Sequence, residues 1–445
     1  MAGDTDFLLE LPQGWSSSKL GAVADVTKLA GYEFTKYVEY DDSGEIMALR
    51  ALNVIDGRLD LTSVKRITKA VSDALPRSKL HKNDILLTYT GSIGQVAVID
   101  KHDKYHLAPN VCRLRVNGEA NVRFVFSFLR SSIFKQQLSS FTVGSTQPTI
   151  PMKSIREIAL PLPPLAEQKA IASILGALDD KIELNRRMNA TLEGMARALF
   201  QSWFVDFDPV RAKLDGRKPE GMDKATAALF PEHFAHGKHD MLPVGWSYST
   251  IEEISAINAW TLGKNDDLET LEYIEISEVS RGNIGNIATY SRGEEPSRAR
   301  RRLRQGDTII STVRPDRGSY FLALNPPENR VASTGFAVLT PTKVPWSFLH
   351  AALTQPEVSD HLGQMADGGA YPAVRPEIIG AMQVAVPDEL KILQAFHRTS
   401  APLFEQAEAN RIQSRTLATL RDTLLPKLLS GELSVASIPK VANDQ

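Results

Sequence analysis

The densest group of chemistry-bearing side chains in the sequence is a run of arginines. Arg298-Ala-Arg300-Arg301-Arg302-Leu-Arg304 holds five arginines in seven residues and directly precedes a Gly-Asp turn. Guanidinium groups are permanently charged and donate paired hydrogen bonds, which suits phosphate groups and the edge of guanine. The run is therefore a candidate DNA contact. The alternative is a solvated basic face whose charge is balanced by Glu294 and Glu295.

A second basic cluster stands in the first half of the chain. Arg77, Lys79 and Lys82 precede Asp84, and the first two correspond to Arg300 and Arg302 of the run when the two halves are aligned. Basic side chains beside a turn can neutralise phosphates and so position a protein on DNA. Recurrence at the same place in both halves favours a DNA contact over an isolated solvated patch.

Glycine-rich polar turns follow both basic clusters, at residues 88–94 and 311–318, and a third kind of turn recurs at residues 144–147 and 368–371. Glycine lets a backbone approach a ligand closely, and polar side chains beside it can donate to phosphates or bases. Ordinary hairpin turns remain the alternative. The side chains that we single out in these turns are Thr90, Ser92, Gln147, Arg314, Arg317 and Tyr371.

Catalytic motifs are missing from the sequence. It has no phosphate-binding loop, no dinucleotide-binding glycine motif, no zinc-protease motif and no nucleophile elbow. Asn325-Pro-Pro resembles the loop with which amino-methyltransferases hold a target amine, but Glu328 stands where that loop needs an aromatic ring to stack on the base. A turn is therefore favoured here, and no catalytic residue is predicted.

Metal and redox chemistry have little support either. His233, His236 and His239 could share one helix face as ligands, but Gly237 between them favours a solvated loop. The single cysteine, Cys112, cannot form an internal disulfide and suits a reducing compartment. We predict no metal site and no cofactor bound by this chain.

Composition narrows the class of protein. The 445 residues carry 51 Lys and Arg against 53 Asp and Glu, a net charge of −2, so any DNA binding must be confined to regions of the surface. The length fits two or three domains. There is no basic leader before an apolar segment, and no apolar stretch of about 18 residues, so we expect a soluble, cytoplasmic protein without a membrane partner.

The chain repeats once. Leu11-Pro-Gln-Gly-Trp15 returns as Leu242-Pro-Val-Gly-Trp246, and four later matches recur in the same order at a nearly constant offset. Collinear matches of this kind indicate a duplication. Within each copy, short β-branched runs alternate with turn signals and brief helical stretches, which predicts an α+β domain.

A long helix is predicted after each copy. In the first, apolar residues and two asparagines recur at spacings of three and four, and the second copy repeats the pattern. Roughly 40 residues make a rod of about 60 Å, somewhat under two turns of DNA. Asn185 and Asn410 occupy equivalent seam positions, where buried amides fix register; solvent exposure is the alternative. Pro402 is expected to kink or split the second helix.

These patterns predict two globular α/β domains in tandem repeat, separated by two long helices that form an antiparallel intramolecular coiled coil with pseudo-twofold symmetry. A linker with one short helix near residues 224–229 joins the copies. The predicted boundaries are 1–163 for the first domain, 164–205 for its helix, 206–241 for the linker, 242–387 for the second domain, 388–430 for its helix, and 431–445 for the tail.

The helical segments carry a family resemblance. Pro161-Leu-Pro-Pro-Leu-Ala-Glu-Gln-Lys-Ala-Ile171, followed by Leu178-Asp-Asp-Lys-Ile182 and closed by Leu424-Leu-Pro-Lys-Leu-Leu-Ser-Gly-Glu-Leu433, resembles the specificity (S) subunit of type I restriction-modification enzymes. The resemblance covers nearly the whole chain. One departure is that the second helix begins with Leu390-Lys-Ile-Leu-Gln394 and lacks the Glu-Gln pair of the first.

The resemblance implies that each domain is a target-recognition domain for one half of a bipartite, asymmetric DNA sequence, with the helices setting the unread spacer. It implies two methyltransferase subunits and restriction (motor) subunits as partners on double-stranded DNA. S-adenosylmethionine, ATP and Mg are then expected on those partners, which methylate adenine and cut DNA, while this chain is not catalytic.

Two other classes of protein compete with this interpretation. A fused methyltransferase-endonuclease would need its own methyl-donor loop, which the sequence lacks. A non-catalytic coiled-coil adaptor would use the same helices but would bind no DNA sequence selectively. Sequence-selective DNA binding in the presence of a methyltransferase subunit separates the specificity-subunit interpretation from the adaptor.

Overall fold

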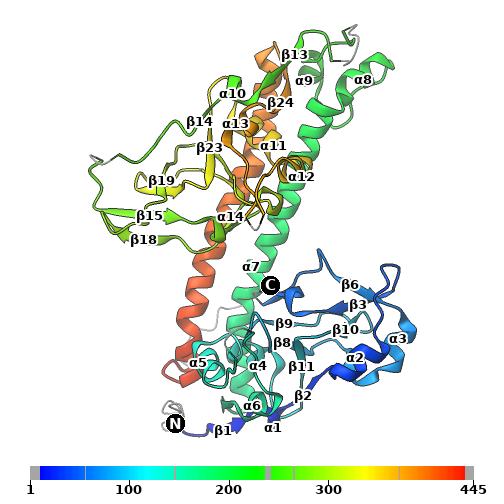
Figure 1. Ribbon diagram of the computed structural model, residues 1–445, viewed down its shortest axis with the longest axis vertical. Helices are drawn as coiled ribbons and strands as arrows, with labels where there is room; N and C mark the ends of the chain where they lie inside the picture. The colour runs from blue at the N-terminus through cyan, green and yellow to red at the C-terminus, as the bar shows by residue number, and fades with distance from the viewer. Residues whose placement is uncertain are drawn as a thin grey trace, which may run out of the picture. The chain divides into compact units, whose positions relative to one another are not determined.

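The computed structural model describes residues 11–55, 57–144, 147–235, 242–263, 266–369 and 371–435. The chain divides into two compact units, one formed by Met1–Glu183 with Ser414–Gln445 and the other by Leu184–Gln413. Two long helices, α7 (Leu165–Phe200) and α14 (Leu390–Ser430), contribute to both units. Figure 1 shows the order of the elements along the chain.

The first unit contains two four-stranded sheets, with strand orders β2-β11-β8-β9 and β6-β3-β10-β7, and two smaller pairings, β1-β12 and β4-β5. Its strands are β1 (Ser16–Lys19), β2 (Ala24–Lys28), β3 (Ile46–Leu49), β4 (Val54–Ile55), β5 (Arg58–Leu59), β6 (Lys65–Ile67), β7 (Lys79–Leu80), β8 (Ile85–Thr88), β9 (Val96–Val98), β10 (Tyr105–Leu107), β11 (Val111–Val116) and β12 (Ala159–Leu162). Its shorter helices are α1 (Leu20–Val23), α2 (Gly31–Tyr37), α3 (Lys69–Ala74), α4 (Val122–Phe128), α5 (Ser132–Ser140), α6 (Met152–Glu157), η2 (Ala51–Asn53) and η3 (Pro76–Ser78).

The second unit repeats this plan with sheets β14-β23-β20-β21 and β18-β15-β22-β19 and the pairings β13-β24 and β16-β17. Its strands are β13 (Trp246–Thr250), β14 (Ser255–Ile257), β15 (Thr270–Ile274), β16 (Val279–Ser280), β17 (Asn283–Ile284), β18 (Ala288–Ser291), β19 (Ala299–Arg302), β20 (Thr308–Ser311), β21 (Tyr320–Leu322), β22 (Arg330–Ser333), β23 (Phe336–Pro341) and β24 (Gln383–Pro387). Its shorter helices are α8 (Asp208–Leu214), α9 (Lys224–Leu229), α10 (Ile251–Ile254), α11 (Trp346–Leu353), α12 (Pro356–Gln364), α13 (Pro376–Gly380), η4 (Gln201–Val205), η5 (Ile276–Glu278) and η6 (Pro315–Arg317).

The matching topology confirms the duplication. Each strand of the first unit has a counterpart at the same place in the second, and the one parallel pairing of each large mixed sheet, β3 with β10 and β15 with β22, recurs as well. The central strands β8 and β20 are buried at all four positions. Burial on both faces explains why these strands are continuous apolar or small-polar runs rather than alternating ones.

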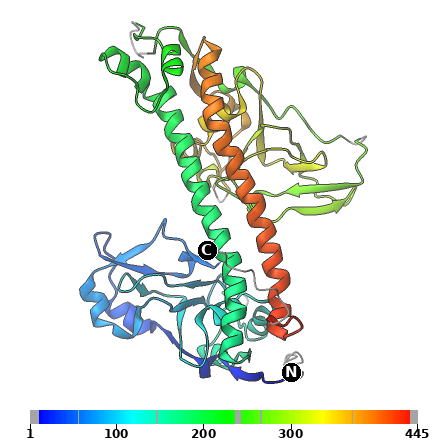
Figure 2. The same cartoon turned by 180° about the vertical axis from the view of Figure 1, so that it is seen from behind.

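The predicted helix seam is also confirmed. Of its positions on α7, Leu175, Asn185, Asn189 and Ala196 are buried, and the remaining apolar ones are half-buried rather than exposed. Within the second unit, rising residue numbers on α7 meet falling numbers on α14: Asn185 bonds Gln413, and Asn189 bonds Ala407. The helices are therefore antiparallel, and they run side by side in Figure 1 and Figure 2.

The seam asparagines form a buried amide network in the second unit. Asn185 Nδ2 donates to Gln413 Oε1 at 2.8 Å and to the Asn410 carbonyl at 3.3 Å. Asn410 Nδ2 donates to Asn189 Oδ1 at 2.9 Å, and Asn189 Nδ2 to the Ala407 carbonyl at 3.0 Å. Because each amide has partners in only one helix alignment, the network specifies register at a cost in stability. The solvent-exposed alternative for Asn185 and Asn410 is wrong.

The expectation that Pro402 splits the second helix is wrong, since α14 is continuous from Leu390 to Ser430. Pro402 is exposed, whereas its neighbours Ala401 and Phe404 are buried against the core. The hydrogen bond that proline removes therefore lies on the solvent side, where water can satisfy the freed carbonyl of Arg398. Packing of the buried side keeps the helix in one piece.

The segment after α7 is more ordered than a linker composition suggests. The short helix predicted near residues 224–229 is α9, but α8 was not predicted. Rings from both sides of this segment pack together in the core of the second unit, and they are Phe200, Trp203, Phe204, Phe207, Phe230, Trp246, Phe348 and Phe396. In the described part of the chain, no helix is both long and apolar enough to cross a lipid bilayer.

Candidate nucleic-acid interface

The glycine-rich turns that the sequence singled out are joined in pairs. In the first unit, Thr90 forms a β-bridge with Thr149, and the Gly91 N–H donates to the Pro148 carbonyl at 3.1 Å. In the second unit, Val313 bridges Ala373, and the Arg314 N–H donates to the Pro372 carbonyl at 2.8 Å. The partners occupy equivalent places in the two copies of the repeat. Each domain therefore joins two segments that are distant in the sequence. We call the joined segments the first paired turn (residues 88–94 with 147–149) and the second paired turn (residues 311–318 with 371–373).

The first paired turn carries small polar groups. The Thr90 hydroxyl lies 2.8 Å from the Thr149 hydroxyl and is half-buried, while Ser92 and Gln147 are exposed. Gly91 has φ +78°, a conformation that a side chain would strain. The two exposed groups, a hydroxyl and an amide, can both donate and accept hydrogen bonds.

The second paired turn carries a cation against an aromatic ring. The Arg314 guanidinium carbon lies 4.5 Å from the centroid of the Tyr371 ring, and Tyr371 is 72% exposed. Arg317 is exposed on the same turn. A cation–π contact at an exposed site contributes about 0.5–1 kcal/mol and limits the conformations of the arginine. The structure thus brings together Arg314 and Tyr371, which the sequence identified in two separate turns.

The arginine run lies on and around the edge strand β19, and its members differ in surroundings. Arg300 pairs with Glu295 at 3.3 Å, and Arg302 lies 3.5 Å from both Asp266 and Glu328. Arg300 therefore has one of the carboxylate partners that the solvated-face alternative names, and its role as a DNA contact stays a prediction. The Arg304 guanidinium stacks on Trp260, 3.1 Å from the ring centroid.

The other two arginines of the run are an exposed one, Arg298, and a half-buried one, Arg301. Burial lowers the pKa of Arg301, and its Nε has no hydrogen-bond partner in the described structure. A half-buried guanidinium without a carboxylate remains able to bind an external acceptor, whereas Arg300 and Arg302 are already partly neutralised.

An exposed arginine such as Arg317 should contribute more to the salt dependence of DNA binding than an arginine that already faces carboxylates. Arg317→Ala should lower the slope of log K against log salt by about 0.9 if Arg317 contacts one phosphate. Arg302→Ala should change it by clearly less, because two carboxylates already share that charge. The slope would be measured by titrating the purified complex of this chain with methyltransferase subunits with duplex DNA at several salt concentrations. Equal changes in the two variants would contradict the assignment.

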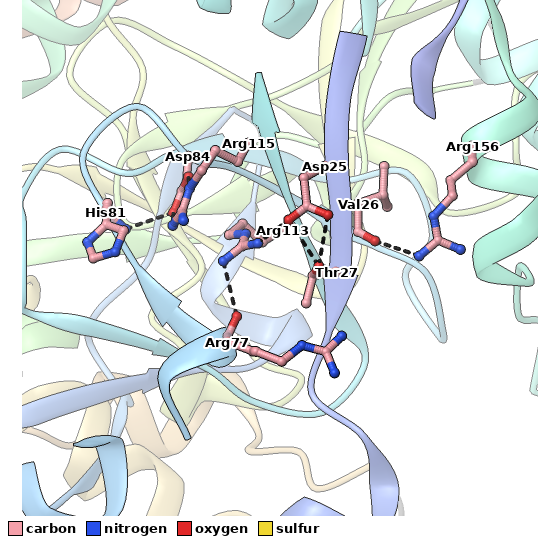
Figure 3. Close-up of polar contacts among 9 residues, drawn as sticks. All are labelled: Asp25, Val26, Thr27, Arg77, His81, Asp84, Arg113, Arg115 and Arg156. Atoms are coloured by element: carbon pink, nitrogen blue, oxygen red, sulfur yellow. Dashed lines mark hydrogen bonds and ion pairs between the residues drawn. The ribbon is translucent and has the colours of Figure 1, made fainter. Parts of the chain in front are cut away.

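The basic cluster of the first domain is anchored through its backbone (Figure 3). The buried Arg113 donates to the Arg77 carbonyl at 3.0 Å and forms an ion pair with Asp25. The Arg77 side chain extends away from Arg113 and is exposed. Lys79 pairs with Asp73, and Lys82 is exposed. Sequence reasoning missed Arg113, although the alternation in Val111-Cys-Arg-Leu-Arg-Val116 was a signal for arginines on one face of a strand.

An aspartate precedes the central strand in both domains, but its interaction partners differ between the two. Asp84 accepts from the His81 N–H and forms a two-point ion pair with Arg115 at 2.7 and 2.8 Å. Its counterpart Asp307 accepts from the Arg304 N–H and from the Thr340 hydroxyl. Burial raises the pKa of Asp307 to about 6, and those hydrogen bonds and the nearby Arg304 charge offset part of the increase.

The raised pKa of Asp307 makes stability depend on pH. Protonated Asp307 stabilises the folded state relative to ionised Asp307. This contribution to the unfolding free energy is fully present below pH 3.8, the pKa of the carboxyl in the unfolded chain, and is lost as the pH rises through about 6. We therefore expect Asp307→Asn to raise the unfolding free energy by about 1–3 kcal/mol at pH 8, with less gain at pH 5. Urea unfolding at both pH values measures this. Asp84→Asn is the matched control and should destabilise at pH 8, because Arg115 loses its partner.

The remaining sequence candidates lie elsewhere. Asn325 has φ +49° in the loop between β21 and β22, and Glu328 pairs with Arg302, in agreement with a turn. His236 and His239 fall outside the described residues, as do Ser145 and Thr146. Among the residues that the structure describes, no group of three or more histidine, cysteine or acidic side chains could hold a metal ion.

The known proteins that this chain resembles are DNA specificity subunits of type I restriction enzymes. Residues 12–194 match the family described as the type I restriction modification DNA specificity domain. The chain is 24% identical to the specificity subunit of the type I restriction enzyme HindI from Haemophilus influenzae, over 94% of this chain and 99% of that protein. It is 23% identical to the MjaIX specificity subunit from Methanocaldococcus jannaschii, over 96% of both.

A solved structure shares the fold. The S subunit of a type I restriction-modification system from M. genitalium superimposes with a TM-score of 0.51 at 17% identity, over 96% of this chain and 98% of that one. The relatives span the duplicated domains and both helices. Residues 12–194 therefore match a type I restriction modification DNA specificity domain, and over nearly its whole length the chain is similar to specificity subunits of type I restriction enzymes.

Proposed function

We propose that this chain is the DNA sequence-recognition subunit of a type I restriction-modification complex. Each recognition domain reads one half of a bipartite target, and the paired helices set the length of the unread spacer. The observation that carries the proposal is the duplication itself: the chain holds two domains of one topology, each with a paired turn, and two long helices contribute to both units.

The two paired turns differ in chemistry, which supports an asymmetric target. The first offers a hydroxyl and an amide, Ser92 and Gln147, whereas the second offers Arg314 on Tyr371. Glutamine pairs well with adenine and arginine with guanine in the major groove. We propose these residues as base readers and the flanking basic residues as phosphate contacts, namely Arg77, Lys79, Lys82, Arg298, Arg301, Arg304 and Arg317, with lesser parts for Thr90, Arg300 and Arg302.

Catalysis belongs to partner subunits in this proposal. Two methyltransferase subunits dock on the assembly, bind S-adenosylmethionine and methylate adenine, and restriction subunits use ATP and Mg to cut unmodified DNA in the cytoplasm. Reaching an adenine inside a duplex requires flipping it out of the stack, which needs a pocket on the enzyme that performs the chemistry. This chain supplies selectivity and scaffold.

Selection from a random duplex library tests the proposal. The complex of this chain with its methyltransferase subunits is incubated with long duplexes of random sequence, and bound DNA is sequenced after repeated rounds. We expect two short, different sequence blocks at one fixed separation. Binding without sequence preference would overturn the proposal and favour the adaptor alternative.

A further inference from the structure

A hairpin turn of the second recognition domain rests on a side chain of the helix pair. Strands β16 and β17 are joined by Arg281-Gly282, where Gly282 has φ +83°. A Cβ atom at Gly282 would lie 2.7 Å from Nη2 of Arg411, which belongs to α14. The guanidinium therefore packs directly on the turn, in space that only glycine leaves open.

Arg411 is held in that place by both helices. It forms an ion pair with Glu193 of α7 and a second one with Glu408 of α14 at 3.3 Å. The Arg411 side chain is 11% exposed and that of Glu193 is 18% exposed. A carboxylate and a guanidinium so shielded from water interact strongly and with defined geometry. Any shift of α7 against α14 would move the guanidinium and the turn resting on it.

The first recognition domain makes the equivalent contact with different residues. Gly57, with φ +82°, lies in the hairpin of β4 and β5, and a Cβ there would be 3.2 Å from the guanidinium carbon of Arg130. Arg130 Nη1 donates to Asp179 of α7 at 2.8 Å. The other oxygen of Asp179 accepts from Arg421 of α14 at 2.8 Å. Here too a guanidinium links the turn to both helices.

The two contacts lie at equivalent glycines, but their arginines come from different elements of the fold. Gly57 and Gly282 occupy equivalent places in the two copies of the repeat, and their hairpins are counterparts. Arg130, however, comes from the loop between α4 and α5, whereas Arg411 comes from a long helix. Different residues reaching the same glycine in both units indicate that the position, rather than one inherited pair, matters.

We propose that Arg411 on Gly282 and Arg130 on Gly57 are positioning residues that fix the orientation of each recognition domain on the helix pair and so sharpen the choice of spacer length. The inference rests on the proposed function. The arginines do not touch DNA in this scheme. They transmit the geometry of the helices to the domain that carries the paired turn.

The test compares duplexes that carry the selected half-sites with the selected spacer, or with one base pair more or fewer. Methylation rates are measured for the complex with wild-type chain, with Arg130→Met, and with the double variant Glu193→Gln, Arg411→Met. Arg130→Met leaves the Asp179–Arg421 pair intact, and the double variant leaves no lone Glu193 charge. We expect the preference for the selected spacer to fall at least about tenfold, while half-site preference stays unchanged.

Gly282→Ala alters the same contact through the turn instead of the arginine, because its methyl group would displace the Arg411 guanidinium without altering any charge. It should relax spacer choice in the same direction. Arg398→Met, at an exposed arginine of the same helix, is the control and should keep the wild-type preference. Variants that methylate all three duplexes more slowly by one common factor would overturn the inference. A wild-type complex with no split target would overturn the proposed function instead.

Discussion

Inserting four residues into both long helices, after Glu183 in α7 and after Gln413 in α14, is expected to lengthen the unread spacer by one to two base pairs while both half-sites stay the same. Four helical residues add about 6 Å and a rotation of about 40° beyond one turn. A base-pair step of B-DNA adds about 3.4 Å and about 35°. The insertion sites lie between the two compact units, so the contacts inside each unit are kept.

The register network predicts a different result for an insertion in α7 alone. The added turn would displace one set of contacts between the helices, either the Asn185–Gln413 bond or the Asp179–Arg421 pair. We therefore expect a lower melting temperature and weaker methylation than with the paired insertion. Methylome sequencing reads the spacer, and thermal unfolding reads the stability. An unchanged spacer in the doubly lengthened chain would contradict the ruler role of the helices.

Replacing Arg314 by alanine is expected to abolish discrimination at one position of the second half-site and to leave the first half-site unaffected. A bidentate arginine–guanine contact contributes about 1–3 kcal/mol of discrimination, which corresponds to roughly 5- to 150-fold. Competition binding with duplexes altered at one base pair at a time measures the loss. A uniform weakening at all positions of both half-sites would assign Arg314 to phosphates instead.

Tyr371 provides the matched pair for that experiment. Tyr371→Phe keeps the ring under the Arg314 guanidinium and should retain most of the discrimination. Tyr371→Ala removes the ring, frees the arginine to adopt other conformations and should reproduce part of the Arg314→Ala loss, since the contact contributes about 0.5–1 kcal/mol. Equal behaviour of the two Tyr371 variants would show that the ring does not orient Arg314.

The architecture was predictable because its signals are periodic or repeated. The seam of α7, with its buried Asn185, follows from spacings of three and four, and the tandem domains follow from matches at a constant offset. The expected split at Pro402 does not occur, because the general rule for proline within a helix ignores which side of the helix packs. Helix α8 was missed since residues 206–214 carry no long apolar pattern.

The candidate interface was predictable only in part. The paired turns contain residues that the sequence had identified, but their joining through Thr149 and Ala373 depends on contacts between segments that are distant in the chain. The partners of Arg302, Asp266 and Glu328, are likewise remote in sequence, so its neutralisation could not be foreseen. The contact of Arg411 with Gly282 has no sequence signal beyond the glycine itself.

The most direct test of sequence recognition by this chain is single-molecule methylome sequencing of a methylation-free host. The host expresses the chain, a type I methyltransferase subunit, or both. The account predicts methyladenine confined to one split, asymmetric motif, and only when both chains are present. A soluble complex of the two chains that leaves no such motif would contradict it.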